Sequence, residues 1–503
     1  MTTQRADGHD PRRVLAALDA LIAAVRAGSA EEAASWPAPT PAFGESAANM
    51  AAYLALRRHD LRSLQESLMV LGLSSLGRLE SRVLEGLQAV RSSLAAIAGE
   101  APGERPSADR FFAGEHLLLQ RSAALFGPRC ERRPVAVLVT CPSEAADDPA
   151  FFVRLVEREV DAIRINCAHD DPDAWGRMVG HARAAAGAGG RALRVFMDLA
   201  GPKIRSGKVA GPGDQRLHRG DALAIAFAGE GETAAREAGC VAVECTLDSP
   251  MRAATAGQRV FYDDGKLGAV VERTAPWGLL TRIETTGNKG VRVKREKGLN
   301  FPDTDFAVDA MTRKDLADLD FVAAHADAIE YSFVQSAADV AHLQDALAQR
   351  REDWRTMAVV LKIETQHAID RLPEILVQAA SQQPTAVMIA RGDLAVEIGF
   401  GRMAEMQEEM LWLAEAAHVP SIWATQVLEH LVSKGTPLRG EMTDAAMAAR
   451  AECVMLNKGP FLGDGLEALS TLLQRMAVHQ HKKTPELRPL RSWAGRSRGG
   501  RAG

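Results

Sequence analysis

The chain has 503 residues, a length that corresponds to about three domains at roughly 150 residues each. Apolar residues make up 47% and charged residues 25%, a composition that excludes a disordered or fibrous protein. Lys and Arg number 60 against 65 Asp and Glu, and the net charge of -5 argues against binding nucleic acid through overall charge, so any anion site must be local.

Targeting and redox signals are weak. Residues 1–13 are polar with no apolar segment behind them, and no stretch approaches the roughly 18 apolar residues of a membrane span, so we expect a cytoplasmic protein without a membrane partner. The six cysteines include no CxxC pair, and only Cys240 and Cys245 are close in sequence. A zinc site there would need two more ligands, so we interpret them as reduced thiols.

The first part of the chain is predicted to be helical. Residues 11–100 carry apolar side chains at helical spacing, as in Leu15, Leu18 and Ile22, and no strand-like alternation interrupts them. We therefore expect a helical N-terminal region over 1–130 that carries no chemical motif.

From residue 132 the pattern changes to short apolar runs separated by amphipathic stretches, which is typical of βα units. There are eight such runs: 135–141, 162–168, 194–201, 328–334, 357–364, 386–393, 420–426 and 453–459. Eight strands with helices between them predict an α/β fold, a (β/α)₈ TIM barrel. An open doubly wound sheet is the alternative.

About 125 residues separate the third run from the fourth, too many for one βα connection. Residues 206–297 alternate short β-rich pieces with Gly, Pro and Asp turns, so we predict a small inserted all-β domain acting as a lid. The barrel then comprises 131–205 and 298–480, and the basic, Gly- and Arg-rich tail 481–503 is expected to be disordered.

Polar residues follow several predicted strands, and the C-terminal strand ends of such a barrel converge on one mouth. Glu364 and Asp393, after neighbouring strands, are candidates to share a hard divalent cation such as Mg²⁺. Lys362 beside them, with Arg164 and Arg205 around it, would stabilise a transferring phosphoryl group or an enolate. The alternative is a set of ion pairs that closes the barrel end.

These residues lie in motifs that resemble those of the pyruvate kinase family. The matching segments, which occur in the family's order, are RINCAH (164–169), DLAGPKIRSG (198–207), YDDGK (262–266), KGLNFP (297–302), LKIET (361–365), ARGDLAVEI (390–398) and ATQVLE (424–429). The resemblance covers about 134–478. Residues 1–130 lie outside it, and the family's C-terminal domain has no counterpart in the sequence.

The resemblance implies a role for each matching residue. Lys362 would stabilise the phosphoryl group and the enolate oxygen, Thr425 would lie where carbon is protonated, and Arg164 would contact phosphate. Glu364 and Asp393 would hold Mg²⁺ or Mn²⁺. The residues implied in substrate or nucleotide binding are Asn166, His169, Arg205, Lys297, Asp264 and the backbone at Ala390, Arg391 and Gly392.

Three departures from the family pattern bear on chemistry. Asn457 replaces the eighth-strand serine thought to help relay a proton, and Ala168 replaces a serine whose hydroxyl helps to bind K⁺. Lys203 stands where K⁺-dependent members have glutamate and K⁺-independent members have lysine. The resemblance therefore implies that Lys203 substitutes for the monovalent cation and that K⁺ is not required.

The leading hypothesis is a glycolytic pyruvate kinase that transfers the phosphoryl group of phosphoenolpyruvate to ADP, giving pyruvate and ATP. One alternative is a catalytically weakened homologue that binds nucleotide or phosphoenolpyruvate as a sensor. Another is a metal-dependent lyase acting through a pyruvate enolate. No nucleic-acid partner is expected, and a homo-oligomer is left open.

Overall fold

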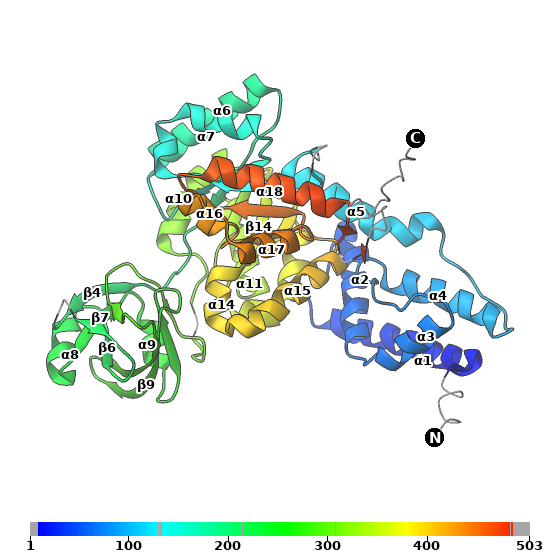
Figure 1. Ribbon diagram of the computed structural model, residues 1–503, viewed down its shortest axis with the longest axis horizontal. Helices are drawn as coiled ribbons and strands as arrows, with labels where there is room; N and C mark the ends of the chain where they lie inside the picture. Colours follow the sequence, from blue (N-terminus) through cyan, green and yellow to red (C-terminus); the bar gives the residue numbers. More distant parts are fainter. Residues whose placement is uncertain are drawn as a thin grey trace, which may run out of the picture.

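A central barrel carries a sheet-rich unit on one side and a helical region on the other (Figure 1). The computed structural model describes residues 9–482, apart from 129, 131–132, 213–214 and 307, and the backbone of 484–485. The predicted tail, 481–503, lies almost entirely outside the described residues.

Eight parallel strands close the barrel in the order β1-β17-β16-β15-β14-β13-β3-β2, which confirms the predicted TIM barrel and excludes the open sheet. The strands are β1 (Ala136–Thr140), β2 (Ala162–Asn166), β3 (Arg194–Asp198), β13 (Ala328–Tyr331), β14 (Ala358–Ile363), β15 (Thr385–Ala390), β16 (Ser421–Ala424) and β17 (Cys453–Leu456). Their near-continuous burial reflects a barrel covered on its outside by helices.

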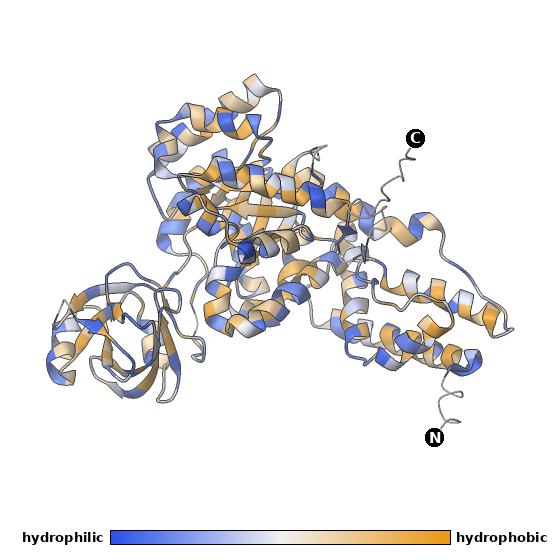
Figure 2. Cartoon of the chain, in the orientation of Figure 1, coloured by the Kyte–Doolittle hydropathy of each residue, from blue (hydrophilic) through white to orange (hydrophobic). Residues whose placement is uncertain are grey.

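The surrounding helices are amphipathic, with apolar faces toward the strands (Figure 2). They are α6 (Pro149–Glu157), α7 (Pro172–Gly189), α10 (Arg313–His325), α11 (Ala337–Ala348), α12 (Gln366–Asp370), α13 (Leu372–Ala380), α14 (Arg391–Ile398), α15 (Phe400–Ala416), α16 (Glu429–Lys434), α17 (Arg439–Ala448) and α18 (Leu462–Ala477). One detail differs from the sequence analysis. The sixth strand ends at Ala390, so Arg391 and Asp393 lie in the first turn of α14.

Between β3 and β13 the chain forms a separate seven-stranded sheet, in the order β12-β8-β9-β10-β6-β7-β4, and a small β11-β5 pair. Its strands are β4 (Ser206–Ala210), β5 (Arg216–Leu217), β6 (Ala222–Ala226), β7 (Val241–Cys245), β8 (Arg259–Tyr262), β9 (Leu267–Ala275), β10 (Gly278–Thr286), β11 (Val291–Arg292) and β12 (Leu299–Asn300). The expectation of an all-β unit was wrong, because α8 (Gly231–Ala238) and α9 (Asp248–Ala253) interrupt the strands. Helix-forming Glu, Ala and Arg dominate α8, and Gly239 ends it in the left-handed conformation.

The N-terminal region is helical: α1 (Pro11–Ala34), α2 (Pro41–Arg57), α3 (Arg62–Val70), α4 (Val83–Ile97) and α5 (Ala108–Phe126). Its apolar core is completed by barrel residues, because Trp412, Leu413 and Ala416 of α15 pack against it. At the end of α5, Phe126 stacks on Phe196 of β3, with ring centroids 5.9 Å apart, and so packs into the barrel interior. No helix among the described residues is both long and apolar enough to cross a membrane.

His418 sits at the junction of the helical region and the barrel. It is buried, and its ring nitrogens lie 3.0 Å from Ser46 Oγ and 3.1 Å from the Ser81 carbonyl oxygen. Helix α5 approaches so closely that a Cβ on Gly114 would lie 2.1 Å from the same carbonyl oxygen. The junction is therefore tightly packed around one imidazole.

Burial lowers the pKa of His418 to about 4, although its hydrogen bond to Ser81 opposes the shift. The unfolded chain takes up this proton near pH 6.5, so stability present above that pH is lost as pH falls toward 4. We expect the free energy of unfolding to drop by about 2 kcal/mol more between pH 6.5 and 5 in the parent than in His418→Gln, measured by denaturant titration.

The matched control is His342→Gln, because His342 is exposed on α11. It should keep the pH dependence of the parent. An equal pH dependence in His418→Gln and the parent would show that His418 does not titrate in this way.

Candidate functional site at the barrel mouth

Three side chains from neighbouring strands form a buried cluster at the C-terminal end of the barrel. The Lys362 ammonium, from β14, lies 3.1 and 3.2 Å from the two carboxylate oxygens of Asp198 at the end of β3. It also donates to Ser332 Oγ at 2.5 Å, and that hydroxyl donates to Asp198 Oδ1 at 3.0 Å. The cluster holds the predicted catalytic lysine in one position.

Arg164 of β2 is held between two carboxylates. Its Nε lies 3.0 Å from Asp198 Oδ2 and 3.0 Å from Glu330 Oε2, and its Nη1 donates to Thr140 Oγ1 at 3.1 Å. Glu330 and Asp198 are register partners on adjacent strands, which explains why both reach one guanidinium. A phosphate that binds Arg164 must compete with these carboxylates.

The charged residues of this cluster shift one another's pKa values. Burial raises the pKa of Asp198, but Lys362 and Arg164 outweigh it and hold that pKa below its ordinary value. Burial and the charge of Asp198 raise the pKa of Glu330. Burial would lower the pKa of Lys362, but Asp198 and Glu364 more than offset it, so the ammonium stays charged.

The residues present fit a divalent cation. Glu364, buried just beyond β14, accepts a hydrogen bond from the Phe333 amide at 2.7 Å and lies 3.2 Å from Lys362 Nζ. Burial raises its pKa, and the nearby negative charge of Asp393 raises it further. Two carboxylates that repel each other at a barrel mouth are a donor set suited to Mg²⁺ or Mn²⁺.

The sixth and seventh strand ends are joined by hydrogen bonds. The Gly392 amide donates to Thr425 Oγ1 at 2.8 Å, which fixes the predicted catalytic hydroxyl against the start of α14. Arg391 donates to the carbonyl oxygens of Ala424 and Thr425 and pairs with Asp444. The Arg391 side chain is therefore buried in the scaffold, and only its backbone is in reach of a substrate at the mouth.

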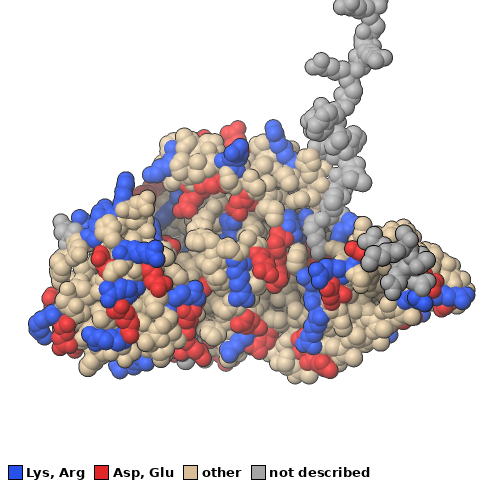
Figure 3. Space-filling model, turned by 60° about the horizontal axis from the view of Figure 1, so that its bottom comes forward, with Lys and Arg blue, Asp and Glu red and all other residues tan. Residues whose placement is uncertain are grey.

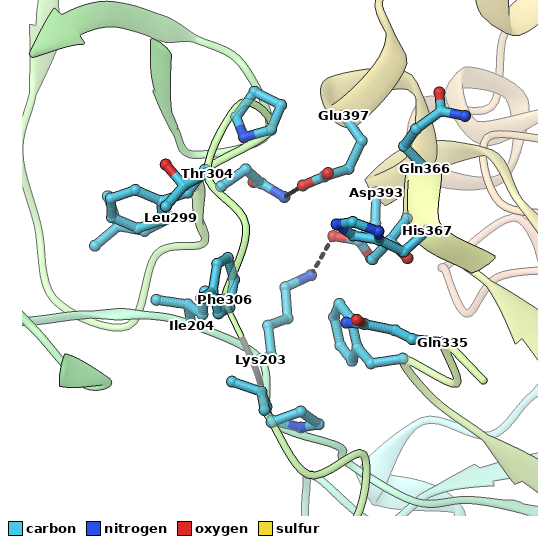
Figure 4. Close-up of a pocket in the computed structure, with 17 residues that line it drawn as sticks. Lys203, Ile204, Leu299, Thr304, Phe306, Gln335, Gln366, His367, Asp393 and Glu397 are labelled. Atoms are coloured by element: carbon cyan, nitrogen blue, oxygen red, sulfur yellow. Dashed lines mark hydrogen bonds and ion pairs between the residues drawn. The ribbon is translucent and has the colours of Figure 1, made fainter. Parts of the chain in front are cut away.

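A cleft separates the inserted unit from the barrel mouth (Figure 4). Across it, Lys203 Nζ lies 2.7 Å from Asp393 Oδ1, and Asn300 Nδ2 donates to Glu397 Oε1 at 3.2 Å. Burial raises the pKa of Glu397 to about 7. Lys203 thus points into the mouth, toward a predicted metal ligand.

A second cavity of about 300 Å³ lies at the ends of β1, β2 and β17. It is lined by Arg164, Asn166, His169, Asn457 and Lys458, among others. Partial burial and the charge of Lys458 lower the pKa of His169. Two predicted binding residues, Asn166 and His169, therefore share a cavity with Arg164.

The remaining predicted residues lie where the inserted unit joins the barrel. Lys297 Nζ pairs with Asp263 at 3.1 Å, and the backbone of Arg205 bonds to Thr246 and bridges to Gly298. Asp263 had not been predicted. Asp264 is next to it in the same left-handed turn, and its role in closing the inserted unit stays a prediction.

On the face in Figure 3, basic and acidic side chains are interspersed. At the barrel mouth, in contrast, cationic side chains are paired with carboxylates from neighbouring strands in one buried cluster.

Glu330 and Ser332 belong to the site although neither was predicted. Both lie in the apolar run 328–334, and an acidic residue inside a buried run was a signal, because a buried carboxylate needs a partner. The identity of that partner depends on which strands are neighbours, and the run alone does not give it.

Comparison with known proteins identifies the family. The family described as pyruvate kinase, barrel domain, matches residues 132–463. A pyruvate kinase of Mycobacterium tuberculosis is 31% identical over 358 residues, which cover 70% of this chain and 71% of that protein. Pyruvate kinase PKLR of Rattus norvegicus is 31% identical, covering 54% of this chain and 46% of the rat protein. The human PKLR protein is 29% identical, covering 66% and 58%.

The matched region thus spans about half the length of the mammalian relatives. It includes every barrel strand and the inserted unit, whereas helices α1 to α5 lie outside the family match. The chain belongs to the pyruvate kinase family.

Proposed function

We propose that this protein transfers the phosphoryl group of phosphoenolpyruvate to ADP, giving pyruvate and ATP in glycolysis. The observation that carries the proposal is the position of Lys362, a charged ammonium buried at the barrel mouth between Asp198 and Glu364. Six unpaired cysteines support a cytoplasmic location for this reaction.

The bond between phosphorus and the enol oxygen breaks while a bond forms to a terminal oxygen of ADP. Negative charge grows on the phosphoryl oxygens and on the enolate oxygen, and Lys362 would offset it. The enolate then takes a proton at carbon, on the side where Thr425 is held. Arg164 would position the phosphate and would exchange a carboxylate partner for it.

Glu364 and Asp393 would hold Mg²⁺ or Mn²⁺, which stabilises negative charge on phosphate and carboxylate oxygens. The K⁺ that many family members bind is replaced in this proposal by the ammonium of Lys203. The nucleotide would lie in the cleft between the inserted unit and the barrel, with Lys297 and Arg205 at its base and Asp264 helping to close it.

The test is an assay with ADP, Mg²⁺ and phosphoenolpyruvate in which ATP and pyruvate are measured separately. Equal amounts of both products support the kinase. Pyruvate without ATP, or neither product, contradicts it.

One observation favours a second candidate, a weakened homologue that senses phosphoenolpyruvate or nucleotide. Asn457, whose Oδ1 lies 3.4 Å from Thr140 Oγ1, stands where the family's relay serine is expected. An amide cannot pass a proton on as a hydroxyl does. Tight binding of phosphoenolpyruvate in a direct titration, together with no turnover in the product assay, would support the sensor.

Glu330 provides a test of the electrostatics. Glu330→Gln removes a charge that competes with phosphate for Arg164, so we expect the KM for phosphoenolpyruvate at pH 7.5 to fall about fivefold, or about 1 kcal/mol, with little change in kcat. The control is Glu232→Gln on the exposed surface of the inserted unit. An unchanged or higher KM in Glu330→Gln would show that Glu330 serves only to hold Arg164.

The Lys203 proposal predicts full activity without K⁺. The rate should be measured against KCl at ionic strength fixed with a tetraalkylammonium salt, because added salt also screens charges. Lys203→Glu combined with Ala168→Ser should create K⁺ dependence, since it removes the ammonium and supplies a hydroxyl ligand. Activation of the parent protein by more than about tenfold, roughly 1.4 kcal/mol, would refute the proposal.

A further inference from the structure

A groove lies within the helical region, far from any motif of the barrel. It runs between α4, α5 and the segment 73–82, and its volume is about 520 Å³, compared with about 300 Å³ for the cavity at the ends of β1, β2 and β17. This size is in the range of small-molecule sites. We call it the arginine groove, after Arg78, Arg82 and Arg105, which line it.

The walls of the arginine groove are largely apolar. They include Leu73, Leu79 and Val90, and the rings of Phe111 and Phe112 from α5. Phe112 is 41% exposed, so part of its ring is open to an occupant of the groove. An occupant with a flat apolar body would cover these rings.

The charge of the groove is positive. Arg82 is stacked over Phe111 and Phe112, 4.7 and 5.0 Å from the ring centroids, and pairs with Glu115, the one acidic residue of the lining. Within the described part of the chain, Arg105 donates only to the Ser93 hydroxyl, and Arg78 has no hydrogen bond or ion pair. Two guanidinium groups are therefore left without a carboxylate among the described residues.

Two arginines of the neighbouring helices differ from Arg78 and Arg105 in having carboxylate partners. Arg91 on α4 pairs with Asp19 at 2.5 Å, and Arg110 on α5 pairs with Glu85 at 3.2 Å. Neither lines the groove. Guanidinium groups bind carboxylates and phosphates with two parallel hydrogen bonds, so the unneutralised pair complements an anion.

From this combination we propose that the arginine groove binds a small organic anion, a carboxylate or phosphate attached to a flat apolar body. The anion lies between Arg78 and Arg105, and the apolar body lies on Phe111 and Phe112. The site is separate from the barrel mouth and does not depend on the proposed kinase activity.

The groove is also connected to the barrel by hydrogen bonds. Ser81, next to Arg82, accepts from His418, and the Val83 amide donates to Asn49 Oδ1 at 2.9 Å. Asn49 in turn donates to the carbonyl oxygen of Ala416 at 2.8 Å. A ligand that contacts Arg82 in the groove would therefore lie next to the segment that bonds to the end of α15 and to His418, which precedes β16.

The test is isothermal titration of the full-length protein with phenyl phosphate, phenylacetate and inorganic phosphate. We expect at least one aromatic anion to bind at least tenfold more tightly than inorganic phosphate. Arg78→Ala combined with Arg105→Ala should weaken that binding at least tenfold, and Phe112→Ala should remove the preference for the aromatic anion. Arg110→Ala, an arginine of α5 outside the groove, is the control and should leave binding unchanged.

The two aromatic probes distinguish the chemical source. A preference for phenyl phosphate assigns organic phosphates to the groove, and a preference for phenylacetate assigns carboxylates. Absence of binding by both probes would overturn the proposal. So would binding that the Arg78 and Arg105 double variant retains, because the probe would then bind elsewhere, including at the barrel mouth.

Discussion

Replacing Lys362 by Met is expected to lower turnover on the order of 10³-fold or more and to leave the affinity for phosphoenolpyruvate nearly unchanged. The reason is that the ammonium, held by Asp198 and Ser332, offsets charge that is largest in the transition state. Turnover is measured under saturating substrate, and affinity by direct titration of phosphoenolpyruvate.

The variant also leaves Asp198 and Glu364 without their shared cation, so folding must be checked by thermal melting. Lys208→Met, at an exposed lysine of the inserted unit, is the matched control and should behave as the parent. A folded Lys362→Met protein with near-normal turnover would remove Lys362 from the mechanism.

A second large effect on activity is expected when one of the two proposed metal ligands, Glu364 and Asp393, is replaced. Asp393→Asn removes one anionic ligand, so the Mg²⁺ concentration for half-maximal rate should rise at least about tenfold and turnover should fall by about 10²-fold. The measurement is initial rate against Mg²⁺ at fixed ionic strength and saturating substrates.

Asp320→Asn, at an exposed position that pairs with Arg350, controls for loss of a carboxylate elsewhere. Because Asp393 also contacts Lys203, equilibrium binding of Mn²⁺ should be measured as well, as a readout independent of turnover. Unchanged Mn²⁺ affinity would show that Asp393 serves as the partner of Lys203 and not as a metal ligand.

The barrel could be predicted from the sequence because each strand is a short apolar run, and runs such as 358–363, separated by amphipathic stretches, are typical of parallel strands that are buried on both faces. The end of the sixth strand could not be predicted in this way. The predicted strand continues to Asp393, but the chain turns into α14 after Ala390, where Arg391 and Gly392 form hydrogen bonds to Ala424 and Thr425 at the end of β16. The local sequence pattern around residue 390 does not indicate which distant residues provide these hydrogen bonds.

The candidate site could likewise be predicted only in part. Lys362, Glu364 and Asp393 could be selected from motifs, whereas the pairing of Glu330 with Arg164 requires β13 to lie beside β3, although more than a hundred residues separate the two strands in sequence. The arginine groove could not be predicted either. Arg78 and Arg105 belong to connecting segments, and only the packing of α4 against α5 brings them together.

The way the helical region obtains its core has a consequence for biosynthesis. That core is completed by Trp412, Leu413 and Ala416 of α15, and Phe126 packs against barrel strands that follow it in sequence. Residue 416 is synthesised about 290 residues after residue 126, roughly 15–60 s later at typical elongation rates. During that interval the first five helices expose an apolar surface with no partner, so chaperone binding to the nascent chain is expected to concentrate there.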